Sequence, residues 1–290
     1  MYPASFEYYR PKRLKEALQL LRKTKDAKLL AGGHSLLPAM KLRVSSPAAV
    51  IDIGRLKGLS DIRVGKKAIK IGALTTHAEI AGSDDIRRAC PVLAEAASMI
   101  GDLQVRNRGT IGGSLAHADP AADYPTVILA LEAEIGAEGA KGKRRIPAEK
   151  FFVDLFTTAL KANEILTEVS VPTMGAGQGG AYFKHRHPAS SYAVVGVCAV
   201  VTLKSGAVSR VRLAVGGVTE KPVLVRGVAE ELEGQKPVAK VIELASARVA
   251  ESIELPLGDL YASGEYRTHL AEVLTRRALA EAVKRAKKSK

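Results

Sequence analysis

Two segments of the chain pair adjacent glycines with a hydroxyl residue, a combination that suits anion binding. The first is Ala31-Gly32-Gly33-His34-Ser35-Leu36, which follows a short apolar stretch. Adjacent glycines let the backbone turn tightly and expose successive N–H groups, and a helix that starts just afterwards adds the positive end of its dipole. The pattern predicts a pyrophosphate site with Ser35 as a further donor. From the glycine pair alone, a plain strand-to-helix turn remains an alternative.

The second segment, Arg106 to Leu115 (RNRGTIGGSL), repeats this pattern about eighty residues later. We expect backbone amides of both segments to converge on one diphosphate, clamped between two subdomains. The carboxylates of Asp119 and Asp123 follow closely and could accept hydrogen bonds from sugar-alcohol hydroxyls, although Asp123 also fits a helix N-cap. The glycine spacing G-x-G-x-x-G is missing after a strand, so the ordinary dinucleotide fold is not indicated.

Other potential catalytic groups are isolated. His185 and His187 lie two apart on an expected strand, but no third ligand type clusters nearby, so we interpret them as solvent or interface residues rather than a metal site. Cys90 and Cys198 lie far apart in apolar stretches and are expected to be packing residues. Two cysteines exclude a four-thiolate cluster on this chain alone.

The first part of the chain must position the glycine segments with alternating short strands and helices. We expect helices over 11–23, 36–42, 90–100 and 124–133, the last with Asp123 as N-cap, and strands over 27–31, 50–53 and 68–73. Thr76 and Glu79 have the capping-box spacing of a helix start, and residues 101–119 are expected to form a loop. This alternation is an α/β pattern.

The pattern changes after a strand that ends at Pro172. Residues 174–180 (MGAGQGG) form a flexible connector, followed by stretches over 181–185, 192–203 and 208–215 that are typical of antiparallel strands. Helices are expected over 238–253 and 265–285. We therefore predict domains over 1–174, itself split near 55–60, and over 180–290.

Composition narrows the classes of protein. The net charge is +14, but basic residues are scattered apart from 141–145 and the tail 284–290, and the chain has no Trp and 4% aromatic residues. Because base-stacking platforms are scarce, nucleic-acid binding is disfavoured. No long apolar run predicts a membrane-spanning helix, and the start lacks a signal-peptide pattern. We expect a cytoplasmic protein, and peripheral attachment at the inner face of the membrane stays open.

Five motifs in order resemble the flavin subunits of the molybdenum hydroxylases. The chain is most similar to medium subunits of aerobic carbon monoxide dehydrogenase and of archaeal aldehyde or glyceraldehyde oxidoreductases. The motifs are residues 31–38, 71–77, 106–123, 184–196 (KHRHPASSYAVVG) and 263–279. The resemblance implies an α+β fold: a two-subdomain FAD-binding module of the PCMH type, similar to vanillyl-alcohol oxidase, followed by an antiparallel sheet with helices.

The resemblance also implies roles for individual residues. Residues 31–36 should meet the pyrophosphate of FAD, and Thr110 to Ser114 should form the opposing wall. Asp123 should bind ribityl or ribose hydroxyls, and Lys184 should approach the pyrimidine side of the isoalloxazine. The full set of expected cofactor-binding residues is Ala31, Gly32, Gly33, His34, Ser35, Leu36, Ile100, Thr110, Ile111, Gly112, Gly113, Ser114, Asp119, Asp123, Ile165, Leu166, Lys184 and Tyr192. Tyr192 is expected to cover one flavin face, and Ile165 or Leu166 to lie against the ring.

The resemblance implies an electron-transfer subunit. A large partner with molybdopterin would oxidise the substrate, and a small partner with two [2Fe-2S] clusters would pass electrons to FAD, which would deliver them to a quinone or another acceptor. Relatives resemble dimers of heterotrimers. A stand-alone FAD-dependent oxidoreductase and a basic binding module without cofactor are the alternatives.

Overall fold

The computed structural model describes residues 1–289, and its first part is a parallel three-stranded sheet. The strand order is β1-β3-β2, with β1 (Glu7–Tyr9), β2 (Ala27–Leu30) and β3 (Ala49–Asp52). The amphipathic helix α1 (Leu14–Lys23) buries Ala17 in a small core with Ile51. Helix α2 (Leu36–Lys41) follows the first glycine segment. The helix and strand positions agree with the sequence pattern, except that β1 was not expected.

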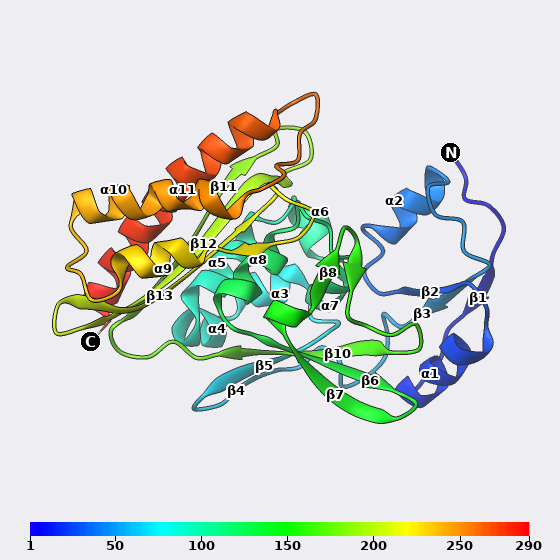
Figure 1. Ribbon diagram of the computed structural model, residues 1–290. Coiled ribbons are helices and arrows are strands. Elements are labelled where there is room, and N and C mark those ends of the chain that lie inside the picture. The colour runs from blue at the N-terminus through cyan, green and yellow to red at the C-terminus, as the bar shows by residue number, and fades with distance from the viewer. Residues whose placement is uncertain (290) are drawn as a thin grey trace.

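An antiparallel five-stranded sheet forms the next layer, at the bottom of the molecule in Figure 1. Its order is β4 (Ile62–Val64), β5 (Ala68–Gly72), β10 (Ile165–Pro172), β6 (Glu134–Gly139) and β7 (Gly142–Pro147). The central strand β10 pairs with β5 and β6, so it closes the sheet long after β5. A hairpin of β8 (Phe152–Asp154) and β9 (Thr157–Thr158) follows a short 3₁₀ turn, η1 (Ala148–Lys150).

Short helices cover this sheet: α3 (His77–Gly82), α4 (Asp84–Ala89), α5 (Pro91–Met99), α6 (Leu103–Arg106), α7 (Ile111–His117) and α8 (Asp123–Ala130). The capping box at Thr76 and Glu79 is confirmed at the start of α3. Two expectations were wrong. Residues 101–119 contain α6 and α7 rather than a loop, and the N-cap of α8 is Ala122, so Asp123 is the first helical residue.

The last part is an antiparallel sheet in sequential order with helices on its outer face (Figure 1). Its elements are β11 (Gln178–Arg186), β12 (Ala193–Lys204), β13 (Ala207–Gly216), β14 (Val223–Leu224), α9 (Arg226–Leu232), α10 (Ala239–Ala247), η2 (Arg248–Ser252) and α11 (Gly264–Lys288). Helices α9 and α11 pack on one face and α8 on the other. The whole is the expected α+β fold, with β14 and α9 as elements that were not predicted. Lys290, the end of the basic tail, lies outside the described residues.

The middle core extends across the junction between the two parts. Tyr182, Cys198 and Ala214 from the last sheet are buried in the same cluster as Cys90 and Val92. Both cysteines are free and fully buried, and burial raises the pKa of the Cys90 thiol to about 12. They therefore act as packing residues.

Polar contacts between partly buried side chains also cross this junction. The guanidinium of Arg285 on α11 binds both carboxylate oxygens of Glu95 on α5, at 2.6 and 3.0 Å, and donates to the Gly180 carbonyl at 2.8 Å.

Within residues 1–289, no helix combines the length and apolar character needed to cross a membrane.

Candidate functional site

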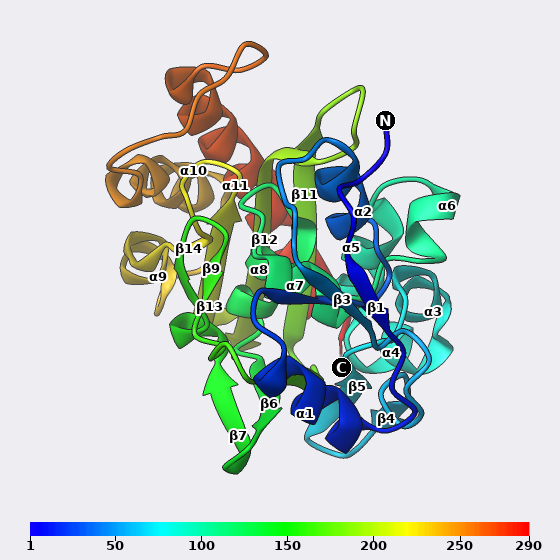
Figure 2. The same ribbon diagram turned by 90° about the vertical axis from the view of Figure 1, so that its right-hand side faces the viewer.

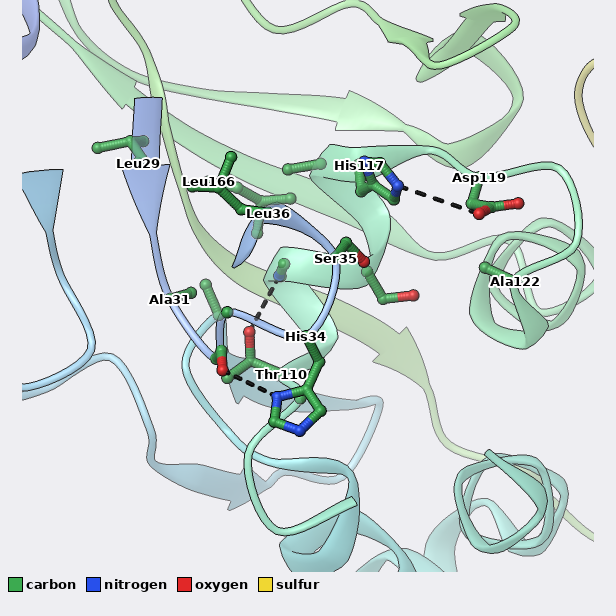
Figure 3. A pocket seen from close by; sticks show the side chains of 18 of the residues that line it. Leu29, Ala31, His34, Ser35, Leu36, Thr110, His117, Asp119, Ala122 and Leu166 are labelled. Carbon is green, nitrogen blue, oxygen red and sulfur yellow. Dashed lines mark hydrogen bonds and ion pairs between the residues drawn. The ribbon is translucent and has the colours of Figure 1, made fainter. Parts of the chain in front are cut away.

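A cavity of about 620 Å³ lies where the three sheets approach one another, and both glycine segments line it. Figure 3 shows the turn that carries His34 and Ser35 facing Thr110 and the helix that ends at His117. The expected residues that line the cavity are Ala31, Gly32, Gly33, His34, Ser35, Leu36, Ile100, Thr110, Gly112, Gly113, Ser114, Asp119, Asp123, Ile165, Leu166 and Tyr192. Two expected residues, Ile111 and Lys184, do not line it.

The first glycine segment presents free backbone donors. Leu37 N–H donates to the Gly33 carbonyl and Ala39 N–H to that of Ser35, which starts α2. Among the described residues, the N–H groups of 32–35 donate no hydrogen bond within the chain. Gly33 has a φ of +78°, a conformation that glycine adopts without a steric penalty. Four successive unsatisfied amides at a cavity wall are well suited to bind an anion.

The second glycine segment is different, because its amides are already used. Ile111 N–H donates to the Thr75 carbonyl at 3.1 Å, Gly112 N–H to that of Ala73 at 2.9 Å, and Gly113 N–H to the Thr110 hydroxyl at 3.1 Å. The first two bonds fasten α7 to the chain that follows β5, and the third caps α7 itself. The expectation that amides of both segments converge on one diphosphate is therefore wrong for this segment, which instead contributes a wall that includes Gly112 and Gly113.

Glycine at position 112 is a packing requirement of this wall. A Cβ there would lie 2.6 Å from the Ala73 Cβ and 2.7 Å from its carbonyl oxygen. Ile111, one residue earlier, is fully buried behind the wall in the middle core. Its side chain thus supports α7 from the side opposite the cavity.

Asp123 lies at the cavity wall, with its Oδ1 already paired. Tyr182 donates its hydroxyl to Oδ1 at 2.8 Å, and the Lys184 ammonium lies 2.8 Å from the same oxygen. Burial raises the pKa of Asp123, and Lys184 and Tyr182 oppose this rise. Lys184 is itself almost completely buried, so its charge faces Asp123 rather than the cavity.

An imidazole and a carboxylate lie together elsewhere on the cavity wall. The Nε2 atom of His117 lies 4.0 Å from Oδ2 of Asp119, and the Asp119 Oδ1 accepts from Ala121 N–H (Figure 3). Burial lowers the pKa of His117, and Asp119 opposes this effect. The Phe156 ring, at the tip of the β8–β9 hairpin, is 5.1 Å from the His117 ring.

Several lining residues were not predicted, among them His77, Phe156 and Glu164. His77 is packed edge-on against Tyr124, with 5.2 Å between ring centres, and its Nδ1 has no partner among the described residues. Burial lowers the pKa of His77 to about 4, so the ring is neutral at pH 7. The capping box and the neighbouring motif were visible in sequence, but nothing there indicated that this imidazole faces the same cavity.

His185 and His187 lie away from this cavity, beside Tyr261. The Tyr261 ring centre is 4.6 Å from that of His187 and 6.2 Å from that of His185. Within residues 1–289, no group of three metal-ligating side chains occurs. These histidines form an aromatic cluster on the surface of the last sheet.

Family comparisons agree with this geometry. Residues 4–174 match the model described as FAD binding domain in molybdopterin dehydrogenase, and residues 180–282 match the CO dehydrogenase flavoprotein C-terminal domain. The chain therefore belongs to the FAD-binding medium subunits of the molybdenum hydroxylase family, which are components of oxidoreductases.

Individual relatives cover nearly the whole chain. The carbon monoxide dehydrogenase medium chain of Hydrogenophaga pseudoflava is 42% identical over 281 residues, which is 96% of this chain and 97% of that one. The glyceraldehyde dehydrogenase medium chain of Sulfolobus acidocaldarius is 37% identical over 281 residues, covering 97% and 99%. A solved carbon monoxide dehydrogenase from Hydrogenophaga pseudoflava superimposes with a TM-score of 0.95 at 40% identity, covering 98% and 99%.

Proposed function

We propose that this chain holds FAD in the cavity between its glycine segments and serves as the electron-transfer subunit of a larger redox enzyme. It accepts electrons from the [2Fe-2S] clusters of a small partner subunit and passes them to an external acceptor such as a quinone. The observation that carries the proposal is the row of unpaired amides at 32–35 facing the glycine wall of α7 across one cavity. When bound, FAD supplies the ability to take up and release electrons.

The residues at the cavity fit the parts of FAD. Amides 32–35 and the Ser35 hydroxyl are donors for a diphosphate, and the wall over 110–114 lets it approach closely because Gly112 and Gly113 carry no side chains. Asp119 and Asp123 offer carboxylate oxygens for ribityl and ribose hydroxyls. Apolar residues suit the flavin ring: Ile100, Ile165, Leu166 and Tyr192. Ile111 holds this wall in place from the core.

The partners and their stoichiometry are proposed by analogy with the family. We propose a large subunit with molybdopterin and a small [2Fe-2S] subunit, assembled as a dimer of heterotrimers in the cytoplasm. The medium chain has a net charge of +14, which favours acidic partner surfaces. We also propose the division into domains 1–174 and 180–290, with a further split of the first near 55–60.

A stand-alone FAD-dependent oxidoreductase is a second candidate. The pair His117–Asp119 at the cavity wall favours it, because an imidazole there could exchange a proton with a substrate over the ring. Co-expression of the chain with cluster-carrying and molybdopterin-carrying subunits separates the two. If the chain purifies alone with FAD and oxidises a substrate without those partners, the electron-transfer role is wrong.

Ligand titration tests the cofactor itself. Purified apo chain is titrated with FAD, ADP and riboflavin, with flavin fluorescence and calorimetry as readouts. Because the amides at 32–35 bind the diphosphate, we expect FAD to bind at least about a hundredfold more tightly than riboflavin, which lacks it. Equal affinity for FAD and riboflavin would mean that these amides do not bind the diphosphate.

A further inference from the structure

The buried ion pair of Lys184 and Asp123 joins elements that are far apart in the chain. Asp123 is the first residue of α8, and Lys184 lies on β11 of the last sheet. Their charged atoms are 2.8 Å apart, and the side chains are only 3% and 5% exposed. Removing such a pair from water is costly, so stability alone does not account for this ion pair.

The Lys184 ammonium has a second partner that explains its position. It donates to the Ser191 carbonyl at 2.8 Å. Ser191 has a φ of +63°, which a residue with a side chain adopts only where its surroundings hold it. Lys184 is thus bonded to the one strained residue of the 187–192 loop.

The 187–192 loop is closed by its own backbone bonds. Ser191 N–H donates to the His187 carbonyl at 2.9 Å, and His187 N–H donates to the Tyr192 carbonyl at 2.8 Å. These bonds shape the loop but do not attach it to the first part of the chain. Lys184 attaches it by bridging Ser191 and Asp123, and just after the loop Ala193 N–H donates to the Ala121 carbonyl at 3.1 Å.

The loop ends at Tyr192, whose side chain enters the cavity wall. Burial raises the pKa of the Tyr192 phenol, Asp119 adds to the rise, and a hydrogen bond with Ser35 opposes it. The phenol therefore lies between the Asp119 side of the cavity and the first glycine segment. Its place depends on the residue just before it, Ser191.

We propose that Lys184 is a positioning residue: through its bonds to Asp123 and the Ser191 carbonyl, it holds the 187–192 loop so that Tyr192 lies over the cavity. Lys184 acts on the ligand through Tyr192. The consequence for FAD rests on the proposed function, whereas the positioning of Tyr192 does not.

A tryptophan reporter measures the positioning without any ligand. The chain contains no Trp, so Tyr192→Trp gives a single fluorophore at the loop. In this background, we expect Lys184→Met to shift the emission to the red and to raise the acrylamide quenching constant about twofold, because a freed loop exposes the ring to water. Lys221→Met is the matched control, since Lys221 also donates to a carbonyl, that of Val153, at 2.8 Å, but far from the loop. Unchanged quenching in Lys184→Met would overturn the proposal.

A second variant keeps the test valid if Lys184→Met alone does not fold. Lys184→Met leaves the Asp123 carboxylate buried and uncompensated, whereas the double variant Lys184→Met/Asp123→Leu removes both charges. The Ser191 carbonyl loses its donor in both. The proposal therefore expects the same rise in quenching in the double variant, and it is wrong if the folded double variant quenches like the parent.

FAD affinity shows whether Lys184 acts on the ligand through Tyr192. With Tyr192 present, we expect Lys184→Met to weaken FAD binding about tenfold; in a Tyr192→Ala background it should change affinity less than about twofold, because the residue it positions is gone. Equal losses in both backgrounds would show that Lys184 affects FAD by a route other than Tyr192 and would contradict the proposal. If the parent chain itself fails to bind FAD, the proposed function fails, and the tryptophan measurement still decides the positioning role.

Discussion

Gly32 and Arg108 bring the two glycine segments into direct contact. A Cβ added at Gly32 would lie 2.0 Å from the Arg108 carbonyl oxygen and 2.9 Å from the Gly109 Cα. All of these are backbone atoms, which a rotamer change cannot move. The first segment can therefore carry no side chain where it meets the turn before α7.

This contact predicts a loss of FAD binding in Gly32→Ala. The methyl group must push the two segments apart, which displaces the free amides at 32–35 from the opposing wall. We expect at least about a tenfold loss of FAD affinity, or about 1.4 kcal/mol, measured by flavin fluorescence titration. Gly82→Ala is the control, because a Cβ at Gly82 has no atom within 4 Å. Similar affinities of the two variants would contradict the role of the Gly32 contact.

The buried His77 predicts a pH dependence of stability. Its pKa is lowered from 6.5 to about 4 in the folded chain, so the unfolded chain takes up the proton first as the pH falls. This contribution to stability is complete above pH 6.5 and is lost progressively as the pH falls towards 4. The full difference corresponds to about 3 kcal/mol.

Urea unfolding between pH 7 and pH 4.5 checks the role of His77. His77→Gln cannot titrate and should flatten this part of the pH profile, whereas the same change at the exposed His269 should leave it as in the parent. A parallel slope in His77→Gln and the parent would show that His77 does not cause it.

The buried Arg267 on α11 is expected to stabilise the fold. This buried guanidinium donates to the carbonyls of Val194 at 2.9 Å and Gly217 at 2.7 Å, and pairs with Asp259. Arg267→Met leaves these carbonyls without their donor, and we expect a loss of about 3 kcal/mol in unfolding free energy. Arg63→Met, which removes an ion pair from a 67% exposed side chain, should cost less than about 1 kcal/mol. Equal unfolding midpoints of the two variants would contradict the stabilising role of Arg267.

Asp123→Asn tests the buried pair from its acidic side. The change leaves the Lys184 ammonium buried opposite a neutral amide, and we expect unfolding free energy to fall by about 3 kcal/mol and bound flavin to decrease. Glu243→Gln removes the exposed partner of Lys240 and should change neither quantity. Calorimetry and the flavin-to-protein absorbance ratio are the measurements. If Asp123→Asn has the unfolding free energy and the flavin-to-protein ratio of the parent, Asp123 contributes neither to stability nor to flavin binding.

Local signals predicted much of this fold, and long-range contacts account for what they missed. Thr76 and Glu79 gave the start of α3, and the glycine pair at 32–33 gave the turn with free amides, because both depend on neighbours in sequence. The pair at 112–113 looked like a loop, since glycine is a poor helix former. It lies in a helix because the Ala73 carbonyl, just after β5, accepts the Gly112 amide and the Thr110 hydroxyl accepts the Gly113 amide.

The same reasoning explains two other differences between the expected and the observed structure. Asp123 has the sequence context of an N-cap, but its side chain is drawn to Tyr182 and Lys184, about sixty residues later. The strand pair β6–β7 was not expected because Gly, Glu and Lys are weak strand formers. Ion pairs across it, such as Arg145–Glu134 at 3.0 Å, compensate. Such partners are set by the assembled fold and have no local pattern.

The core shared by Tyr182, Cys198 and Val92 constrains the order in which parts of the chain can fold during translation. The ribosome produces helices α5 and α8 well before β11 to β13, so the apolar surfaces that later receive these strands are exposed during elongation. On the proposed function, FAD binding waits until the last sheet has docked, because Asp123 meets Lys184 only then. A polypeptide truncated at Met174 would leave that surface open to aggregation and would be a poor vehicle for studying cofactor uptake.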